Sequence, residues 1–143
     1  MEFKMISSDE EWRWFQSVTH VIRCEDTQGI IAYDERGIQA MCVADSFSVD
    51  SCNVHFAVPN PLAIRSGIFT VFADWVFDAL GKKRMFGLVP DNNEKALKLD
   101  KHIGFHEVAR VPDAIADGVG YIVMRLDKED CRWRSAHKEQ EAA

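Results

Sequence analysis

The sequence predicts an α/β fold in which a central mixed sheet is flanked by helices. Its 143 residues suit a single domain. Hydrophobic residues make up 47% and charged residues 28% of the chain, as in ordinary globular proteins. The apolar pattern indicates the order strand, helix, three strands, helix, strand, helix and two strands. Elements that alternate in this way form one sheet with helices packed on it.

The first half of the chain predicts a helix followed by an antiparallel meander. Residues 8–22 place apolar side chains on one helical face and begin at a Ser7-Ser8 capping signal. Three short apolar segments follow, and Asp34-Glu35-Arg36-Gly37 is typical of a hairpin turn between the first two. The expected strands are a short first strand around Phe3 and Met5, and then residues 29–33, 38–44 and 52–58.

The hydrophobic period changes after Pro59-Asn60-Pro61, because proline cannot donate to a strand ladder. Residues 64–79 follow helical spacing, with apolar side chains on most of the circumference. Phe69 and Phe77 lie off the main inward face of this helix, which predicts either a second packing layer or a dimer contact. The remaining expected elements are a strand at 85–89, a helix at 93–103, and strands at 105–111 and 120–126 joined by a polar loop at 112–118. We therefore expect one domain over residues 1–126 and a charged C-terminal tail, 127–143, that frays.

The composition argues against several classes of protein. The chain has 17 Lys and Arg against 23 Asp and Glu, a formal charge of -6, so no nucleic-acid partner is expected. No apolar run reaches the length of a membrane span, and the N-terminus lacks a secretory signal, so no membrane partner is expected either. The four cysteines are far apart and form no C-x-x-C pair, which predicts reduced thiols in a cytoplasmic protein. No cluster of ligand side chains predicts a metal site.

A spaced set of residues in the second half carries the main functional signal. Asn93 is followed by Ala96 three residues later and by Gly104-Phe105 eleven and twelve residues later. This spacing resembles the second signature block of the GNAT family of N-acetyltransferases, and the order of elements is similar to that family over residues 1–126. With its Cys131-Arg132-Trp133 ending, the chain also resembles phage-encoded members of the family.

The resemblance implies a GNAT-like acyl-CoA N-acyltransferase fold and transfer of acetyl from acetyl-CoA to an amine by direct attack. It implies no metal, a small-molecule or peptide amine as the substrate, and leaves a homodimer open. In the family, the strand at 52–58 separates at a bulge, which places acetyl-CoA in a cleft between this strand and the strand at 85–89. The residues that it implies for cofactor binding are Phe56, Ala57, Val58, Ile64, Arg65, Ser66, Gly67, Asn93 and Ala96.

Two positions depart from the family pattern. The first signature block, which holds pyrophosphate on backbone N–H groups at a helix start, retains only Arg65 and Gly67 as recognisable anchors. Seven residues after Asn93, where many members have a tyrosine as general acid, this chain has Asp100. An aspartate there either lies on a solvated helix face beside a lysine or donates a proton if its pKa is raised. Asp100 is therefore one of two catalytic candidates.

His55 is the other catalytic candidate. It lies in the strand expected to face the acetyl group, where it would accept the amine proton, or else be held by a hydrogen bond across the strand pair. Asp45 and Asp50 are interpreted as turn residues. Glu25 and Asp26 follow the first helix, in the region where family members line the acceptor site, and are candidates for binding a cationic substrate.

The departures also define an alternative function. A GNAT-like domain with a weakened first block and no tyrosine acid is compatible with a catalytically degenerate module that serves in binding or assembly. The intact second block does not distinguish this alternative from an enzyme, because its residues maintain the fold in both cases.

Overall fold

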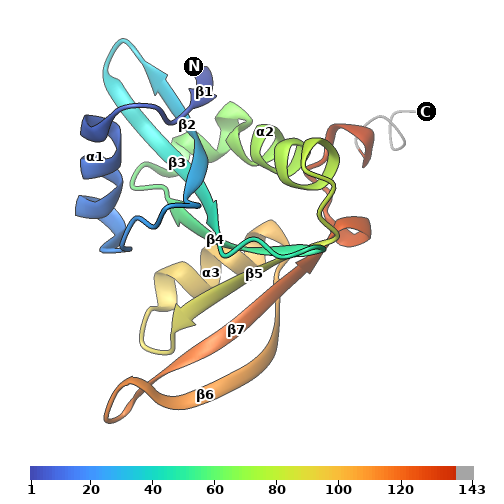
Figure 1. Cartoon of the computed structure of the whole chain (residues 1–143). Coiled ribbons are helices and arrows are strands. Elements are labelled where there is room, and N and C mark those ends of the chain that lie inside the picture. Colours follow the sequence, from blue (N-terminus) through green and yellow to red (C-terminus); the bar gives the residue numbers. More distant parts are fainter. Residues whose placement is uncertain (138–143) are drawn as a thin grey trace.

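One seven-stranded mixed sheet organises residues 1–137, the part of the chain that this computed structural model describes (Figure 1). The strand order is β1-β2-β3-β4-β5-β7-β6, and β4 and β5 are the parallel pair among antiparallel neighbours. The strands are β1 (Glu2–Met5), β2 (Gln28–Asp34), β3 (Gly37–Asp45), β4 (Ser51–Ala57), β5 (Arg84–Pro90), β6 (His106–Ala116) and β7 (Val119–Asp127). The predicted α/β class is confirmed.

Helices cover both faces of the sheet (Figure 1). On one face, α1 (Asp9–Thr19) packs Trp12 and Phe15 against the strand side chains Ile31 and Met41. The predicted cap of α1 is present. The Ser8 side chain accepts from the Glu11 N–H, and the Glu11 side chain accepts from the Ser8 N–H. On the other face, α2 (Ile68–Ala73) and α3 (Glu94–Ile103) enclose the larger hydrophobic core.

The helix predicted over residues 64–79 consists of three segments. A 3₁₀ helix, η1 (Pro61–Ser66), is followed by α2 and then by a π-helical segment, η2 (Asp74–Ala79). Gly67 separates η1 from α2 with φ of 97°, a left-handed conformation that glycine adopts without steric penalty. Phe69 and Phe77 are both buried in the same hydrophobic core as Phe72 and Val76, so the predicted dimer contact is wrong for these two residues.

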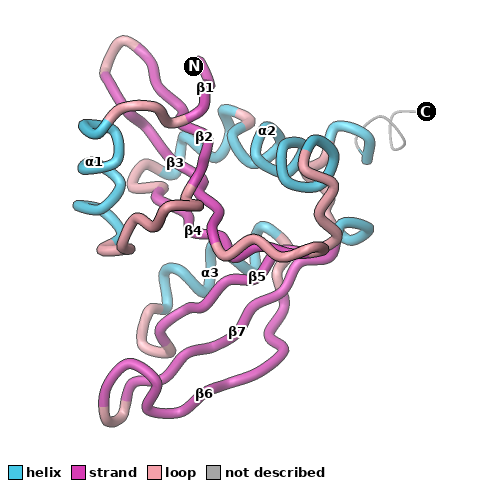
Figure 2. The backbone as a smooth tube through the Cα atoms, viewed as in Figure 1, coloured by secondary structure: helices cyan, strands magenta, loops and turns pink. Residues whose placement is uncertain are grey.

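The polar loop expected at 112–118 is largely strand. β6 continues to Ala116 with an irregular register between Val111 and Ala116, and the turn comprises Asp117 and Gly118. Pro112 is tolerated because β6 is the edge of the sheet, where a missing N–H breaks no ladder on the open side. The β6–β7 hairpin extends away from the helices (Figure 2).

The expectation that the C-terminal tail frays is wrong for the described part of it. After a short 3₁₀ turn, η3 (Lys128–Asp130), Cys131 is buried and the Trp133 Nε1 donates to the Ile103 carbonyl at 2.8 Å. Arg134 Nη2 donates to Asp78 Oδ1 at 2.8 Å. Packing of the Trp133 ring on Phe69 holds the segment to α2, the bond to Ile103 holds it to α3, and the ion pair holds it to η2. The rest of the predicted tail, 138–143, lies outside the described residues. Within residues 1–137 no helix combines the length and the hydrophobicity needed to cross a membrane.

Candidate active site

The parallel strands β4 and β5 separate in the middle of the sheet. They pair from Ser51–Arg84 to Asn53–Phe86, and then each continues without pairing to the other, to Ala57 and to Pro90. Along a strand, the N–H and C=O groups of successive residues point alternately toward the neighbouring strands on its two sides. Some of these groups in residues 54–57 therefore point into the gap between β4 and β5. The bulge expected in this strand is absent over 53–57, where the register with β3 is regular. The two strands diverge instead.

A cavity of about 520 Å³ lies where the strands diverge. It is lined from both faces of the sheet, because the end of α1 contributes on one side and α3 on the other. Its wall comprises Val18, Thr19, His20, Val21, Val54, His55, Phe56, Val58, Pro59, Pro61, Ile64, Gly87, Leu88, Val89, Pro90, Asn93, Lys95, Ala96, Leu99 and Asp100. A cleft between these two strands was the sequence prediction, and the cavity confirms its position.

His55 lines the cavity and is bonded across the strand pair. Its Nε2 lies 3.0 Å from Asp45 Oδ2, which is on β3. Asp45 is only 7% exposed and also accepts from the Ser46 hydroxyl, so its interpretation as a simple turn residue is wrong. A carboxylate at Nε2 favours the tautomer in which Nε2 carries the proton and Nδ1 keeps its lone pair. The cross-strand hydrogen bond is thus confirmed, and the role of His55 as a base stays a prediction.

Asp100 lies in the cavity wall with a buried carboxyl group. The residue is 6% exposed, and its Oδ2 packs on Gly87 of β5 so closely that a Cβ there would lie 3.1 Å from it. Burial raises the pKa of Asp100 to about 7. The interpretation as a solvated aspartate paired with a lysine is therefore wrong. At neutral pH this carboxyl group is in part protonated.

The second signature block is explained first by helix capping. Asn93 is the N-cap of α3, and its Oδ1 accepts from the Ala96 N–H at 3.1 Å. Gly104 ends the helix with φ of 121°, and the Phe105 ring packs against the ring of Phe56 in the core. Asn93 and Ala96 also line the cavity, so the cap places this turn of α3 at the site.

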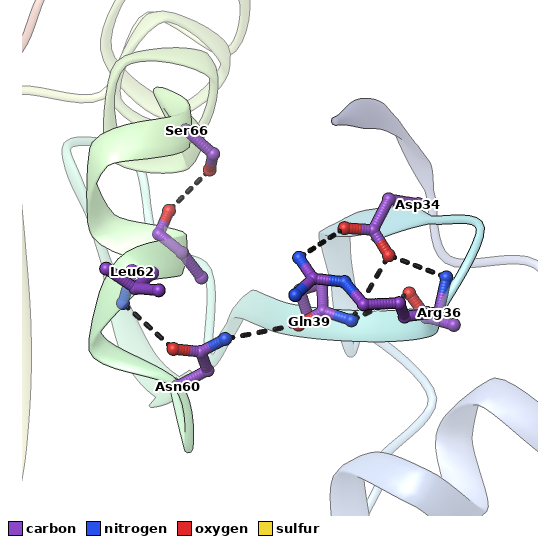
Figure 3. A network of polar contacts seen from close by, with 8 residues as sticks. Asp34, Arg36, Gln39, Asn60, Leu62 and Ser66 are labelled. Carbon is purple, nitrogen blue, oxygen red and sulfur yellow. Dashed lines mark hydrogen bonds and ion pairs between the residues drawn. The ribbon is translucent and has the colours of Figure 1, made fainter.

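The start of η1 is held by a polar network that reaches the β2–β3 hairpin (Figure 3). Asn60 Oδ1 accepts from the Leu62 N–H at 3.0 Å, while its amide nitrogen donates to Gln39 Oε1 at 3.4 Å. Gln39 in turn donates to Asp34 Oδ1 at 3.3 Å, and the guanidinium of Arg36 donates to Asp34 Oδ2 at 2.9 Å. Two N–H groups at this helix start, those of Leu62 and Ala63, are thereby satisfied by Asn60.

The predicted cofactor residues are only partly brought together. Phe56, Val58 and Ile64 line the cavity, whereas Ala57, on the α1 face of β4, does not. Arg65, Ser66 and Gly67 are also outside the cavity wall, and the Ser66 hydroxyl donates to the Ala63 carbonyl. Pyrophosphate binding at residues 64–67 stays a prediction.

Glu25 and Asp26 are not part of the cavity wall. Both are exposed, and Asp26 Oδ2 accepts from the Phe47 N–H at 3.4 Å. Sequence reasoning missed the end of α1, residues 18–21, and the strand residues Gly87 and Leu88. No local signal marks them, because strand divergence alone brings them to the cavity. Among the described residues, no group of three or more His, Cys, Asp or Glu side chains is arranged to hold a metal ion.

Comparison with solved structures identifies the fold class. The chain superposes on mutant forms of the spermidine/spermine N-acetyltransferase SpeG of Vibrio cholerae with a TM-score of 0.72 and 9% identity, over 92% of this chain and 97% of that one. For smu.2055 from Streptococcus mutans UA159 the TM-score is 0.71 at 12% identity, over 90% and 99%. For a putative acetyltransferase of the GNAT family from Desulfovibrio desulfuricans it is 0.68 at 13% identity, over 89% and 98%.

The chain therefore has the fold of the GNAT acetyltransferases, as its resemblance to that family predicted. No protein-family model and no curated protein sequence matches it.

Proposed function

We propose that this protein transfers an acetyl group from acetyl-CoA to a primary amine in the cavity between β4 and β5. The observation that carries the proposal is the placement of two ionisable side chains, His55 and Asp100, in the wall of one cavity at the divergent strands of a GNAT fold. Groups that can accept and donate a proton are what amine attack on a thioester requires.

The cavity suits the pantetheine part of acetyl-CoA. Unpaired backbone groups of β4 face a gap between apolar walls, and Gly87 presents no side chain to it. Phe56, Val58, Ile64 and Ala96 would contact the cofactor, with Asn93 holding the adjacent turn of α3. The residues predicted for the pyrophosphate, Arg65, Ser66 and Gly67 with Ala57 on the strand, belong to the same proposal. Bound acetyl-CoA supplies a thioester carbonyl carbon as the electrophile.

His55 acts as the base in this proposal. Because its Nε2 donates to Asp45, the lone pair of Nδ1 is the one that accepts the proton of the incoming ammonium. The Asp45 carboxylate holds the ring in this tautomer and stabilises the imidazolium that forms. Asp45 is therefore a positioning residue that acts through His55.

Asp100 acts as the acid. Its pKa of about 7 keeps the carboxyl group partly protonated at neutral pH, so the side chain can donate where the family has a tyrosine. Desolvation by burial is the physical cause, since low-dielectric surroundings disfavour the charged form of the carboxyl group. The aspartate would thus replace the tyrosine without loss of the donor function.

A thermal-shift titration combined with a thiol-release assay tests the proposal. A ligand that binds only the native state raises the melting temperature, so acetyl-CoA and CoA should both raise it, and the tighter ligand should raise it more at equal concentration. A panel of amines with acetyl-CoA should then release free CoA thiol. Binding without thiol release from any amine would favour the degenerate binding module, and no thermal shift at millimolar acetyl-CoA would refute the cofactor site itself.

A further inference from the structure

We propose that the acceptor is a monoamine with an apolar substituent, which enters along the α1 side of the cavity, and that polyamines are poor acceptors. This inference rests on the proposed acetyl transfer. It concerns the part of the cavity wall made by Val18, Thr19, His20, Val21 and His55, which we call the α1-side wall.

The two sides of the cavity have different roles in the proposed reaction. Ile64, Asn93 and Ala96, which are cofactor candidates, lie with α2 and α3 on one face of the sheet. His55 shares the opposite face with Ala57, whose side chain packs beneath α1. The amine must approach His55, so it is expected from the α1 side.

The α1-side wall is apolar at its edge. Val18 is 39% exposed at the end of α1, and Ile22, which directly follows the wall, is 77% exposed. Branched apolar side chains left in solvent beside a cavity are suited to bury an apolar substituent. Each methylene that a ligand buries there contributes about fourfold in affinity.

Carboxylates are absent from the α1-side wall among the described residues. Asp45, which contacts the wall through His55, is engaged by the His55 Nε2 at 3.0 Å. Asp9, on α1, pairs with Arg23 at 3.3 Å, and that guanidinium also lies 5.0 Å from the centre of the Trp12 ring. Asp100 is the one acidic residue in the described cavity wall, and it belongs to α3 on the other side.

These charges distinguish two kinds of amine. One ammonium group is accommodated, because it transfers its proton to His55 and becomes neutral before it reacts. A second ammonium group on the same molecule would lose part of its hydration beside Val18 and Val21 without a counter-charge from the wall, which is unfavourable. The α1-side wall therefore favours an amine whose substituent is apolar over a polyamine, which carries a second charge at the same position.

A matched pair of amines tests this inference by binding alone. Heptan-1-amine and hexane-1,6-diamine have nearly the same length and differ in a terminal methyl against a terminal ammonium group. Calorimetric titration of each into protein saturated with CoA should give at least tenfold tighter binding of heptan-1-amine. Equal or tighter binding of hexane-1,6-diamine, or no binding of either amine, would overturn the inference.

A charge placed in the wall should reverse the preference. Val18→Glu adds a carboxylate at a partly exposed helical position, so it should weaken heptan-1-amine and strengthen hexane-1,6-diamine, each by about tenfold. Val49→Glu is the matched control, because Val49 is 89% exposed and outside the cavity wall, and it should leave the ratio unchanged. An unchanged ratio in Val18→Glu would also overturn the inference.

The outcomes separate this inference from the proposed function. Thiol release with hexane-1,6-diamine favoured would retain acetyl transfer and refute the acceptor class. Selective binding of heptan-1-amine without thiol release would retain the acceptor class and refute acetyl transfer.

Discussion

Asp100→Asn should change how the stability of the protein depends on pH. In the folded protein the pKa of Asp100 is about 7, whereas its value without burial is 3.8. Between these values the folded state holds a proton that the unfolded state has lost, so the free energy of unfolding falls as pH rises from about 4 to about 7. At about 1.4 kcal/mol for each pH unit, the whole loss is about 4 kcal/mol, of which about 3 kcal/mol falls above pH 5. Asparagine keeps the shape and has no proton to lose.

Urea unfolding at pH 5 and at pH 8 measures this difference. From pH 5 to pH 8, the free energy of unfolding of the variant should rise relative to that of the wild type by up to about 3 kcal/mol. Other titrating groups contribute equally to both proteins and drop out of this difference. Asp117→Asn, in the exposed β6–β7 turn, is the matched control and should leave the wild-type pH dependence unchanged. Parallel pH curves for the wild type and Asp100→Asn would show that Asp100 is already ionised in the folded protein, and the acid role would fail with them.

Three further predictions concern other parts of the chain. His55→Gln should lower turnover about 10²- to 10⁴-fold with acetyl-CoA affinity nearly unchanged, as measured by steady-state kinetics and calorimetry; wild-type turnover would assign His55 to packing. Trp133→Ala should lower the free energy of unfolding in urea by roughly 2 to 3 kcal/mol, because the ring packs on Phe69 and its Nε1 donates to the Ile103 carbonyl. An unchanged urea midpoint would mean that the C-terminal segment does not stabilise the fold. Gly67→Ala should cost about 1 to 2 kcal/mol in the same assay from its left-handed backbone alone, since a Cβ there meets no atom within 4 Å; a neutral result would contradict the φ of 97°.

Local interactions account for the features that the sequence could predict. The cap of α1 at Ser8, the end of α3 at Gly104 and the Asn93–Ala96 spacing all depend on residues within one or two turns of each other. Apolar periodicity likewise indicated strands and helices in the correct order, because burial of one face is a property of the segment. These signals were sufficient for the α/β class, whereas the position of the cavity between β4 and β5 followed from the resemblance of the Asn93 block to the GNAT family.

Long-range packing decided the chemistry of the site. The spacing from Asn93 pointed to Asp100, but its raised pKa depends on contact with Gly87 of a neighbouring strand. The bond from Asp45 to His55 likewise depends on the β3–β4 register.

Long-range contacts also decided the structure of the C-terminal segment. Its charged sequence indicated fraying, yet Trp133 and Arg134 find partners on α3 and η2 about 30 and 56 residues away. Such contacts exist only once the sheet has brought distant segments together, and desolvation and hydrogen bonding then set which groups hold protons.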